Sequence, residues 1–248
     1  MKYYIASPFF DEASQNWVKA KEDEFKGFGT SFFSPRQDGV NFHEPELTPK
    51  LRSERIKGIF RNNIHQLDSC DKIVCNLNFC KGRVDIGTLF ELGYFVGNTN
   101  LNPFQDSQCF IDGNQSILNE AGEICGKLRS AVTEEVNNYS VIWYSKVQDY
   151  SMIEESLTFL NLIHIDVKSV TESISSGKIE LSKDNNVILL DDFPTETIIL
   201  LGWMYAKGIP YFTCSFRGFG SNVMIAASSK GHMQIPAFVD DTYRENLL

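Results

Sequence analysis

The sequence predicts an α/β protein built on parallel sheets, and two features of the chain carry this prediction. Short apolar segments typical of strands alternate with longer segments whose apolar residues recur at three- and four-residue steps, as in helices. Strands that alternate with helices form parallel sheets with covered faces. The same series begins again near residue 138, so we expect two tandem copies of one unit, over residues 1–130 and 138–248, packed as an intrachain pseudo-dimer.

In the first half, prolines and glycines mark where the elements begin and end. Gly27 closes the first helix, and Pro49 stands at the first position of the second, where its missing N–H costs nothing. The Pro-Arg-Gln-Asp-Gly segment at 35–39 is typical of a loop. The expected elements, in chain order, are strand 2–6, helix 11–27, strand 30–34, helix 48–69, strand 72–77, helix 85–97, strand 108–111 and helix 117–128.

The helix expected over residues 85–97 is the most informative stretch of the chain. Its apolar residues follow helical spacing, Asp85 is a suitable N-cap, and Gly97-Asn98 is a suitable stop. Glu91 interrupts the apolar face among aromatic and aliphatic neighbours, and a carboxylate in such surroundings costs free energy unless it is paired or used. Glu91 and Asp85 therefore predict a functional cleft. The alternative is a capping aspartate and a glutamate that reaches solvent.

The second half repeats the series with one difference. Expected there are strands 140–144, 162–167 and 186–191, a helix over 152–160 and a last helix beginning at Pro194. Aligning the shared Thr-x-x-x-Leu-Gly-aromatic pattern of the two similar helices places Leu200 where Glu91 stands and Pro194 where Asp85 stands. The second helix keeps the pattern that builds the first one but lacks both carboxylates. We therefore expect one catalytic site, in the first half, and an inactive counterpart in the second.

Composition narrows the class of protein. A formal net charge of −9 without a basic stripe argues against nucleic acid as a partner. No apolar run reaches the roughly 20 residues of a membrane helix, and no leader segment is recognisable, so a cytoplasmic protein without membrane contact is expected. The six cysteines lack Cys-x-x-Cys spacing and the four histidines are scattered, so we expect free thiols, no metal site and no cofactor.

Three motifs together resemble the nucleoside 2-deoxyribosyltransferase family. They are Tyr-Tyr-Ile-Ala-Ser-Pro-Phe-Phe at 3–10, Ser-Pro-Arg-Gln at 34–37 and Asp-x-Gly-Thr-x-x-Glu-Leu-Gly-Tyr at 85–94. The similarity covers residues 1–98 and extends to the second half only as a degenerate copy. The resemblance implies a flavodoxin-like, that is Rossmann-like, parallel sheet and an enzyme of nucleotide metabolism that serves purine and pyrimidine salvage.

The resemblance also implies roles for single residues. By position, Glu91 is the nucleophile, Asp85 assists at the nucleobase and Phe10 flanks the substrate. An acidic residue often stands near the sugar in this family, and the alignment places Asn63 there, which leaves its role open. The remaining residues expected at the substrate are Ser7, Gln37, Gly87 and Tyr94, with Gln37 as a base contact and Tyr94 as a group that orients the nucleophile.

Family members are dimers or larger, and an Asn-x-Met segment of one subunit completes its neighbour's site. The first half lacks this segment after Gly97, where Asn114-Gln115-Ser116 is the nearest candidate, whereas the second half contains it with Asn222 and Met224. The resemblance therefore implies a monomeric pseudo-dimer, or a homo-oligomer, whose live site combines both halves. The alternative is that Asn222 only caps a helix.

Three functions stay open at this point. The first is transfer of 2-deoxyribose between nucleobases, with a deoxynucleoside and a free nucleobase as partners and a covalent glycosyl-Glu91 intermediate. The second is hydrolysis of a nucleoside or nucleotide N-glycosidic bond, as the main or a side activity. The third is a non-catalytic nucleotide sensor. The first loop, 6–10, has one serine and two aromatic residues, which suits base stacking better than phosphate binding and favours nucleosides.

Overall fold

The computed structural model of the 248-residue chain describes residues 1–39, 49–107, 109–135, 140–143, 162–163, 178–181, 186–189, 195–215, 222–230 and 232–234. Three of the sequence-based expectations lie outside these residues: the helix over 152–160, the strand residues 164–167 and the helix start at Pro194.

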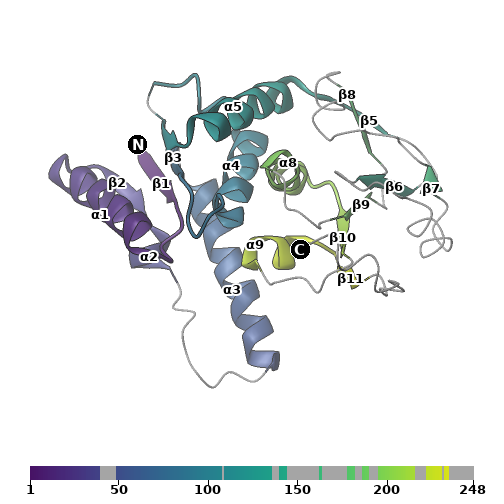
Figure 1. Cartoon of the computed structure of the whole chain (residues 1–248), viewed down its shortest axis with the longest axis horizontal. Coiled ribbons are helices and arrows are strands. Elements are labelled where there is room, and N and C mark those ends of the chain that lie inside the picture. Colours follow the sequence, from purple (N-terminus) through teal and green to yellow (C-terminus); the bar gives the residue numbers. More distant parts are fainter. Residues whose placement is uncertain are drawn as a thin grey trace.

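The first half forms a four-stranded sheet in which all strands run parallel. Its order is β2-β1-β3-β4, built from β1 (Lys2–Ala6), β2 (Ser31–Phe33), β3 (Lys72–Leu77) and β4 (Phe110–Gly113). Helix α1 (Glu12–Gly27) covers one face, and α3 (Pro49–Asp68), α4 (Ile86–Thr99) and α5 (Gln115–Ser130) cover the other (Figure 1). This strand order is that of flavodoxin-like folds, as the resemblance implied.

Three local expectations differ from the structure. Residues 35–39, expected as a loop, begin with the short helix α2 (Pro35–Asp38), because Pro35 pre-sets the helical φ and the Asp38 carboxylate accepts from the Ser34 N–H at 3.0 Å. Helix α4 continues past Gly97 and ends at Asn100, which takes the left-handed conformation with φ 55°. Strand β4 begins two residues later than expected, at Phe110.

The second half forms a five-stranded parallel sheet of order β11-β10-β9-β6-β7. Its strands are β6 (Ser140–Trp143), β7 (Leu162–Ile163), β9 (Asn186–Leu189), β10 (Tyr211–Ser215) and β11 (His232–Gln234). Counted within this half, the strands lie in the order 2-1-3-4-5, which extends the order of the first sheet by one strand. A separate parallel pair joins β5 (Val132–Glu135) to β8 (Lys178–Leu181).

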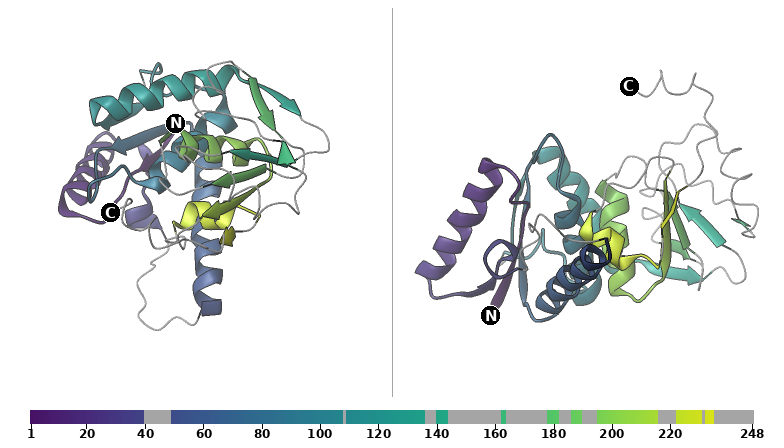
Figure 2. Two further views of the ribbon diagram at one scale, coloured as in Figure 1. Left: turned by 45° about the vertical axis from the view of Figure 1, so that its right-hand side comes forward. Right: turned by 90° about the horizontal axis from the view of Figure 1, so that it is seen from below.

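The helices of the two halves meet between the two sheets. Helices α4 and α5 of the first half face α8 (Thr195–Ala206), and α3 faces α9 (Val223–Ser228), so the layers follow one another as α1, first sheet, helices, second sheet (Figure 2). One continuous apolar core includes buried residues of both halves, such as Phe90 and Leu200. Within the described part of the chain, no helix is long and apolar enough to cross a membrane.

Two glycines allow α4 and α8 to approach closely. A Cβ on Gly93 would lie 1.9 Å from the carbonyl oxygen of Ile199, and a Cβ on Gly202 would lie 2.1 Å from that of Phe90. The alignment of the two helices pairs Gly93 with Gly202 and Phe90 with Ile199, so the two contacts are the same contact seen from either side. Reciprocal contacts of this kind are the mark of a two-fold interface. The duplication itself stays a prediction, which this geometry supports.

Candidate functional site

The candidate site lies at the carboxyl ends of β1 and β3, where the strand order reverses. Adjacent strands β1 and β3 send their following segments to opposite faces of the sheet, which is where open α/β sheets bind ligands. Hydrogen bonds tie the two loops together: Asn76 Nδ2 donates to Ser7 Oγ at 3.2 Å, and Asn78 donates to Asn76 Oδ1. Ser7, expected at the substrate, is buried and donates to the Pro8 carbonyl at 2.8 Å, so it shapes this loop.

Glu91 is buried at this edge of the sheet, on the second turn of α4, with 5% of its surface exposed. The Tyr4 hydroxyl of β1 donates to Glu91 Oε1 at 2.7 Å, and Asn63 Nδ2 of α3 donates to the same oxygen at 3.2 Å. Among the described residues, none donates to Oε2. The carboxyl group is therefore fixed in orientation through one oxygen while the other stays available for a ligand.

The surroundings of Glu91 favour its protonated form. Burial raises the pKa of Glu91 to about 8, with a further rise from the charge of Asp85, although the hydrogen bonds from Tyr4 and Asn63 act in the opposite direction. Burial likewise raises the pKa of Asp85, against the N–H groups of Thr88 and Gly87. Two carboxyl groups that each disfavour ionisation of the other retain a proton at neutral pH.

Asp85 caps α4, as the sequence predicted. Its Oδ2 accepts from the Thr88 N–H at 2.8 Å and from the Thr88 hydroxyl at 3.0 Å. Gly87 lies close to the same carboxylate, since a Cβ on Gly87 would stand 3.0 Å from Asp85 Oδ2. Asp85 therefore caps α4, and it also lies close enough to Glu91 for its charge to raise the pKa of that group. The alternative in which Glu91 reaches solvent is wrong, because Glu91 is buried.

The second half contributes to this edge. A Cβ on Gly87 would lie 3.8 Å from Asn222 Nδ2 and 3.8 Å from Met224 Cγ, and Asn63 Nδ2 lies 4.0 Å from Met224 Sδ. Asn222 is also the N-cap of α9, where its Oδ1 accepts from the N–H groups of Met224 and Ile225. Because the cap uses only the oxygen, the Nδ2 end faces the first half.

Tyr94, which was expected to orient the nucleophile, has a different hydrogen-bond partner in the structure. The Tyr94 hydroxyl donates to Asp68 Oδ1 at 2.6 Å, at the end of α3, where Asn98 also donates. Tyr94 lies almost one turn beyond Glu91, and its ring centroid lies 6.0 Å from that of Tyr205. The hydroxyl that does bond Glu91 is that of Tyr4, a strand residue that the sequence analysis did not single out. No signal in the sequence distinguishes Tyr4 from its neighbour Tyr3 in this strand.

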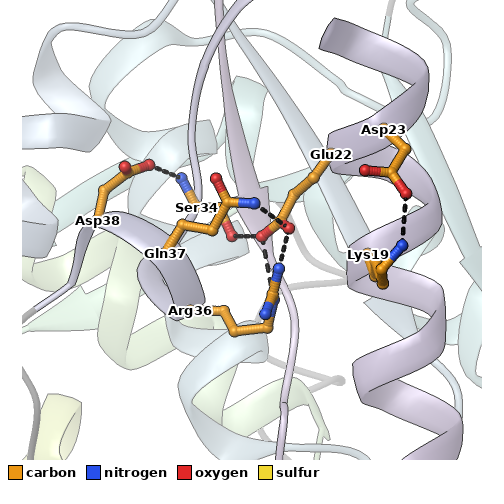
Figure 3. A network of polar contacts seen from close by, with 7 residues as sticks. All are labelled: Lys19, Glu22, Asp23, Ser34, Arg36, Gln37 and Asp38. Atoms are coloured by element: carbon orange, nitrogen blue, oxygen red, sulfur yellow. Dashed lines mark hydrogen bonds and ion pairs between the residues drawn. The ribbon is translucent and has the colours of Figure 1, made fainter.

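Gln37, expected as a base contact, is engaged by a different carboxylate (Figure 3). Glu22 of α1 is fully buried and accepts from Ser34 Oγ at 2.6 Å and from both Arg36 and Gln37. A buried carboxylate requires such partners, so Gln37 closes this network. An acidic residue in a helix is ordinarily exposed to solvent, so the sequence alone gave no sign that Glu22 competes for Gln37.

Two loop phenylalanines are exposed at the site. Phe10, in the loop after β1, has 53% of its surface exposed and its ring centroid lies 5.2 Å from that of Phe9. Phe79, in the loop after β3, is equally exposed and was not predicted. Exposed aromatic rings are suited to stack against a flat ring system.

Metal chemistry finds no support in the part of the chain that the structure describes. No group of three or more histidine, cysteine, aspartate or glutamate residues there is arranged to hold an ion. Cys70, Cys75, Cys80, Cys109 and Cys125 are free thiols, as expected.

Comparisons with known proteins point to one family. Residues 3–102 match the model of a family described as Nucleoside 2-deoxyribosyltransferase. The chain is also similar to a solved structure described as a 2-deoxyribosyltransferase from the psychrotolerant bacterium Bacillus psychrosaccharolyticus, with 15% sequence identity, a TM-score of 0.26, and coverage of 100% of this chain and 93% of that one. No curated protein matches the chain. The matched segment contains Tyr4, Asn63, Asp85 and Glu91 and ends before Asn222.

Proposed function

We propose that this chain, whose residues 3–102 match the nucleoside 2-deoxyribosyltransferase family, moves 2-deoxyribose between nucleobases through a glycosyl ester on Glu91. The observation that carries the proposal is the setting of Glu91. It is a buried carboxyl group held through one oxygen by Tyr4 and Asn63, at the sheet edge where ligands bind, with its second oxygen unbonded among the described residues. Buried, perturbed carboxyl groups in such positions are typical of catalytic sites.

In the first half-reaction, the Glu91 carboxylate forms a bond to the anomeric carbon of a deoxynucleoside as the N-glycosidic bond breaks. The transition state resembles an oxocarbenium ion, which a neighbouring carboxylate stabilises. The departing base takes a proton from Asp85, whose pKa is raised by burial, which favours the protonated form.

In the second half-reaction, an acceptor base replaces the first. Its ring nitrogen bonds to the anomeric carbon, its proton passes to Asp85, and the ester to Glu91 breaks. The protein returns to its starting state with one carboxylate and one carboxyl group. Phe10 supplies a face on which both bases stack in turn. No metal or organic cofactor takes part in either step.

The site combines both halves of one chain in this proposal. Asn222 and Met224 approach Gly87 and Asn63 from the second half, and the reciprocal glycine contacts of α4 and α8 hold that half in place. Asn222→Ser tests the point, because serine still caps α9 but lacks the amide nitrogen. We expect a folded protein with a KM for the deoxynucleoside raised about tenfold. An unchanged KM would reduce Asn222 to its role as a cap.

The function is tested by incubating the full chain with a deoxynucleoside, with and without a second free base. A new deoxynucleoside indicates transfer. Release of free base alone indicates a hydrolase, and no change indicates a binding protein without activity. Mass spectrometry after rapid acid quench should find one deoxyribosyl group on the peptide that contains Glu91, and Glu91→Gln is the matched control that must lack it.

A further inference from the structure

The turn at residues 80–83, between β3 and α4, holds a lysine in a backbone conformation that lysine rarely adopts. Cys80 and Arg83 exchange backbone hydrogen bonds of 2.8 and 3.4 Å, and the two residues between them have positive φ, 53° for Lys81 and 84° for Gly82. Two-residue turns of this kind favour asparagine, aspartate or glycine at the first position. A lysine there costs about 1 kcal/mol, and such a cost near a site is a reason to look for a role.

The same turn is fastened to the loop that carries Phe10. Asp11, the residue after Phe10, caps α1 by accepting from the Ser14 N–H at 2.9 Å. The hydroxyl and N–H of Ser14, with a contribution from the Lys81 N–H, lower the pKa of Asp11 to about 2. Ser14 Oγ also lies 3.9 Å from the sulfur of the buried Cys80. The backbone of Lys81 is therefore held at a fixed place beside the aromatic loop.

The side chain of Lys81 reaches over the Phe10 ring. Its Nζ lies 5.9 Å from the ring centroid, within range of a cation–π contact, and both side chains are exposed. Lysine has a flexible four-carbon stem, so the ammonium group can move from the face of Phe10 to the edge of a flat base that stacks there. An ammonium group donates three hydrogen bonds and accepts none, so it pairs with a carbonyl oxygen and has no pairing with an amino group.

We propose that Lys81 is a specificity-determining residue that selects nucleobases carrying an exocyclic carbonyl oxygen, such as hypoxanthine, over the matching amino bases, such as adenine. The ammonium group donates to the carbonyl oxygen, and it also stabilises the partial negative charge that develops on the base before Asp85 has protonated it. The inference deepens the proposed function and depends on it for the identity of the ligand. It rests on the tethered turn and on the position of Lys81 over Phe10.

The test compares two acceptors that differ only in the group on C6. With one common deoxynucleoside as donor, Lys81→Met should lower kcat/KM for hypoxanthine about tenfold and leave kcat/KM for adenine within about twofold, as expected for one charge-assisted hydrogen bond. Lys81→Arg keeps the cation and should keep most of the preference. Lys19→Met is the matched control, since Lys19 is an exposed lysine of α1 paired with Asp23 at 2.8 Å.

A second variant distinguishes the effect of the Lys81 side chain from the effect of the turn conformation. Lys81→Asn suits the left-handed position and should raise the unfolding temperature while it abolishes the preference for hypoxanthine. If Lys81→Met and Lys81→Asn both retain the preference, or if the unmodified protein has none, the inference is overturned.

Measuring the binding of free bases tests the role of Lys81 independently of the proposed transfer reaction. Calorimetric titration should show hypoxanthine binding that weakens about tenfold in Lys81→Met, with adenine binding unchanged. This holds even if no transfer is observed, which would count against the reaction alone. Equal hypoxanthine binding in both proteins would overturn the role of Lys81 and leave transfer by Glu91 untouched.

Discussion

Helices α4 and α8 each follow the third strand of a sheet with the same strand order and pack against each other, yet only α4 carries a buried carboxyl group. Glu91 of α4 is buried with two hydrogen-bond donors, whereas the equivalent Leu200 of α8 is fully buried in the apolar core. The glycines at the crossing, Gly93 and Gly202, are retained in both helices.

The comparison separates what the fold requires from what the proposed chemistry requires. Close packing of α4 on α8 needs a glycine at one position of each helix, and both helices have it. Burial of a carboxyl group stabilises nothing by itself, because its ionisation is opposed by the apolar surroundings. A helix without a reaction to perform should therefore replace the carboxyl group by an aliphatic side chain, as α8 does.

The largest expected effect comes from giving α4 the residue of α8. Glu91→Leu should lower the rate of transfer by about six orders of magnitude, the scale seen when a nucleophile is removed. It should also raise the free energy of unfolding at neutral pH, since the buried carboxyl group is replaced by an apolar group of similar size. Activity assays and urea unfolding measure the two effects.

The matched control is Leu200→Ala. It should destabilise the protein by about 2–5 kcal/mol through the cavity it leaves, while the folded fraction keeps its kcat/KM. A Glu91→Leu protein with residual transfer near that of the unmodified chain would end the assignment of the nucleophile.

The next largest expected effect is a pH dependence of stability that comes from the buried carboxyl group of α4, which α8 lacks. The pKa of Glu91 is raised from 4.5 to about 8, so the folded protein binds more protons than the unfolded one between these values. Stability from this group is fully present below pH 4.5 and falls by about 1.4 kcal/mol per pH unit as the pH rises to about 8, for a total near 5 kcal/mol. Urea unfolding of the unmodified chain and of Glu91→Gln across this range should give curves that diverge by this amount. Parallel curves would mean that Glu91 ionises as it does in the unfolded chain.

Replacing either glycine of the contact between α4 and α8 should have a smaller effect on stability, and this effect should be the same for both glycines. Gly93→Ala and Gly202→Ala each place a methyl group against a carbonyl oxygen of the facing helix, and about 3 kcal/mol of stability should be lost in each case. Gly58→Ala is the control: a Cβ there meets nothing within 4 Å, and the helix α3 should gain about 0.5–1 kcal/mol. Unequal losses for Gly93 and Gly202 would contradict a two-fold contact.

The sequence predicted α4 well because its signals are local. The cap at Asp85 and the apolar spacing around Glu91 depend on residues within a few positions of each other. Gly97 was misread as a helix stop because glycine has two uses. Here Gly97 lies inside the helix and allows α8 to pack closely, since a Cβ on Gly97 would stand 2.7 Å from the Cβ of Ala206. No local pattern distinguishes a glycine that ends a helix from one that lets a distant helix approach.

The hydrogen-bond partners of the site residues could not be predicted from the sequence, for a similar reason. Tyr94 and Tyr4 both carry a hydroxyl, and which one meets Glu91 depends on how far α4 is rotated above β1. Gln37 was assigned to the substrate because the buried carboxylate of Glu22, fifteen residues earlier, could not be recognised as a competitor. These contacts are fixed by packing across the fold rather than by spacing along the chain.

The smallest expected effect comes from removing the hydroxyl group of Tyr4. Tyr4→Phe removes the hydrogen bond to Glu91 Oε1, which both orients the carboxyl group and favours its ionised form. We expect kcat/KM at pH 7 to fall about tenfold, in line with the loss of one hydrogen bond to a charged group.

The pH profile decides whether Tyr4 acts through Glu91. In the unmodified chain, kcat/KM should rise with pH toward about 8, because the nucleophile must lose its proton. In Tyr4→Phe this rise should move to higher pH, so that part of the lost rate returns in alkaline buffer. Tyr3→Phe is the matched control, because Tyr3 precedes Tyr4 on β1, stacks on Phe25 at 4.8 Å and should change neither rate nor profile. If the Tyr4→Phe rate falls with the profile unmoved, the hydroxyl contributes only to packing, and Glu91 owes its ionisation to the substrate instead.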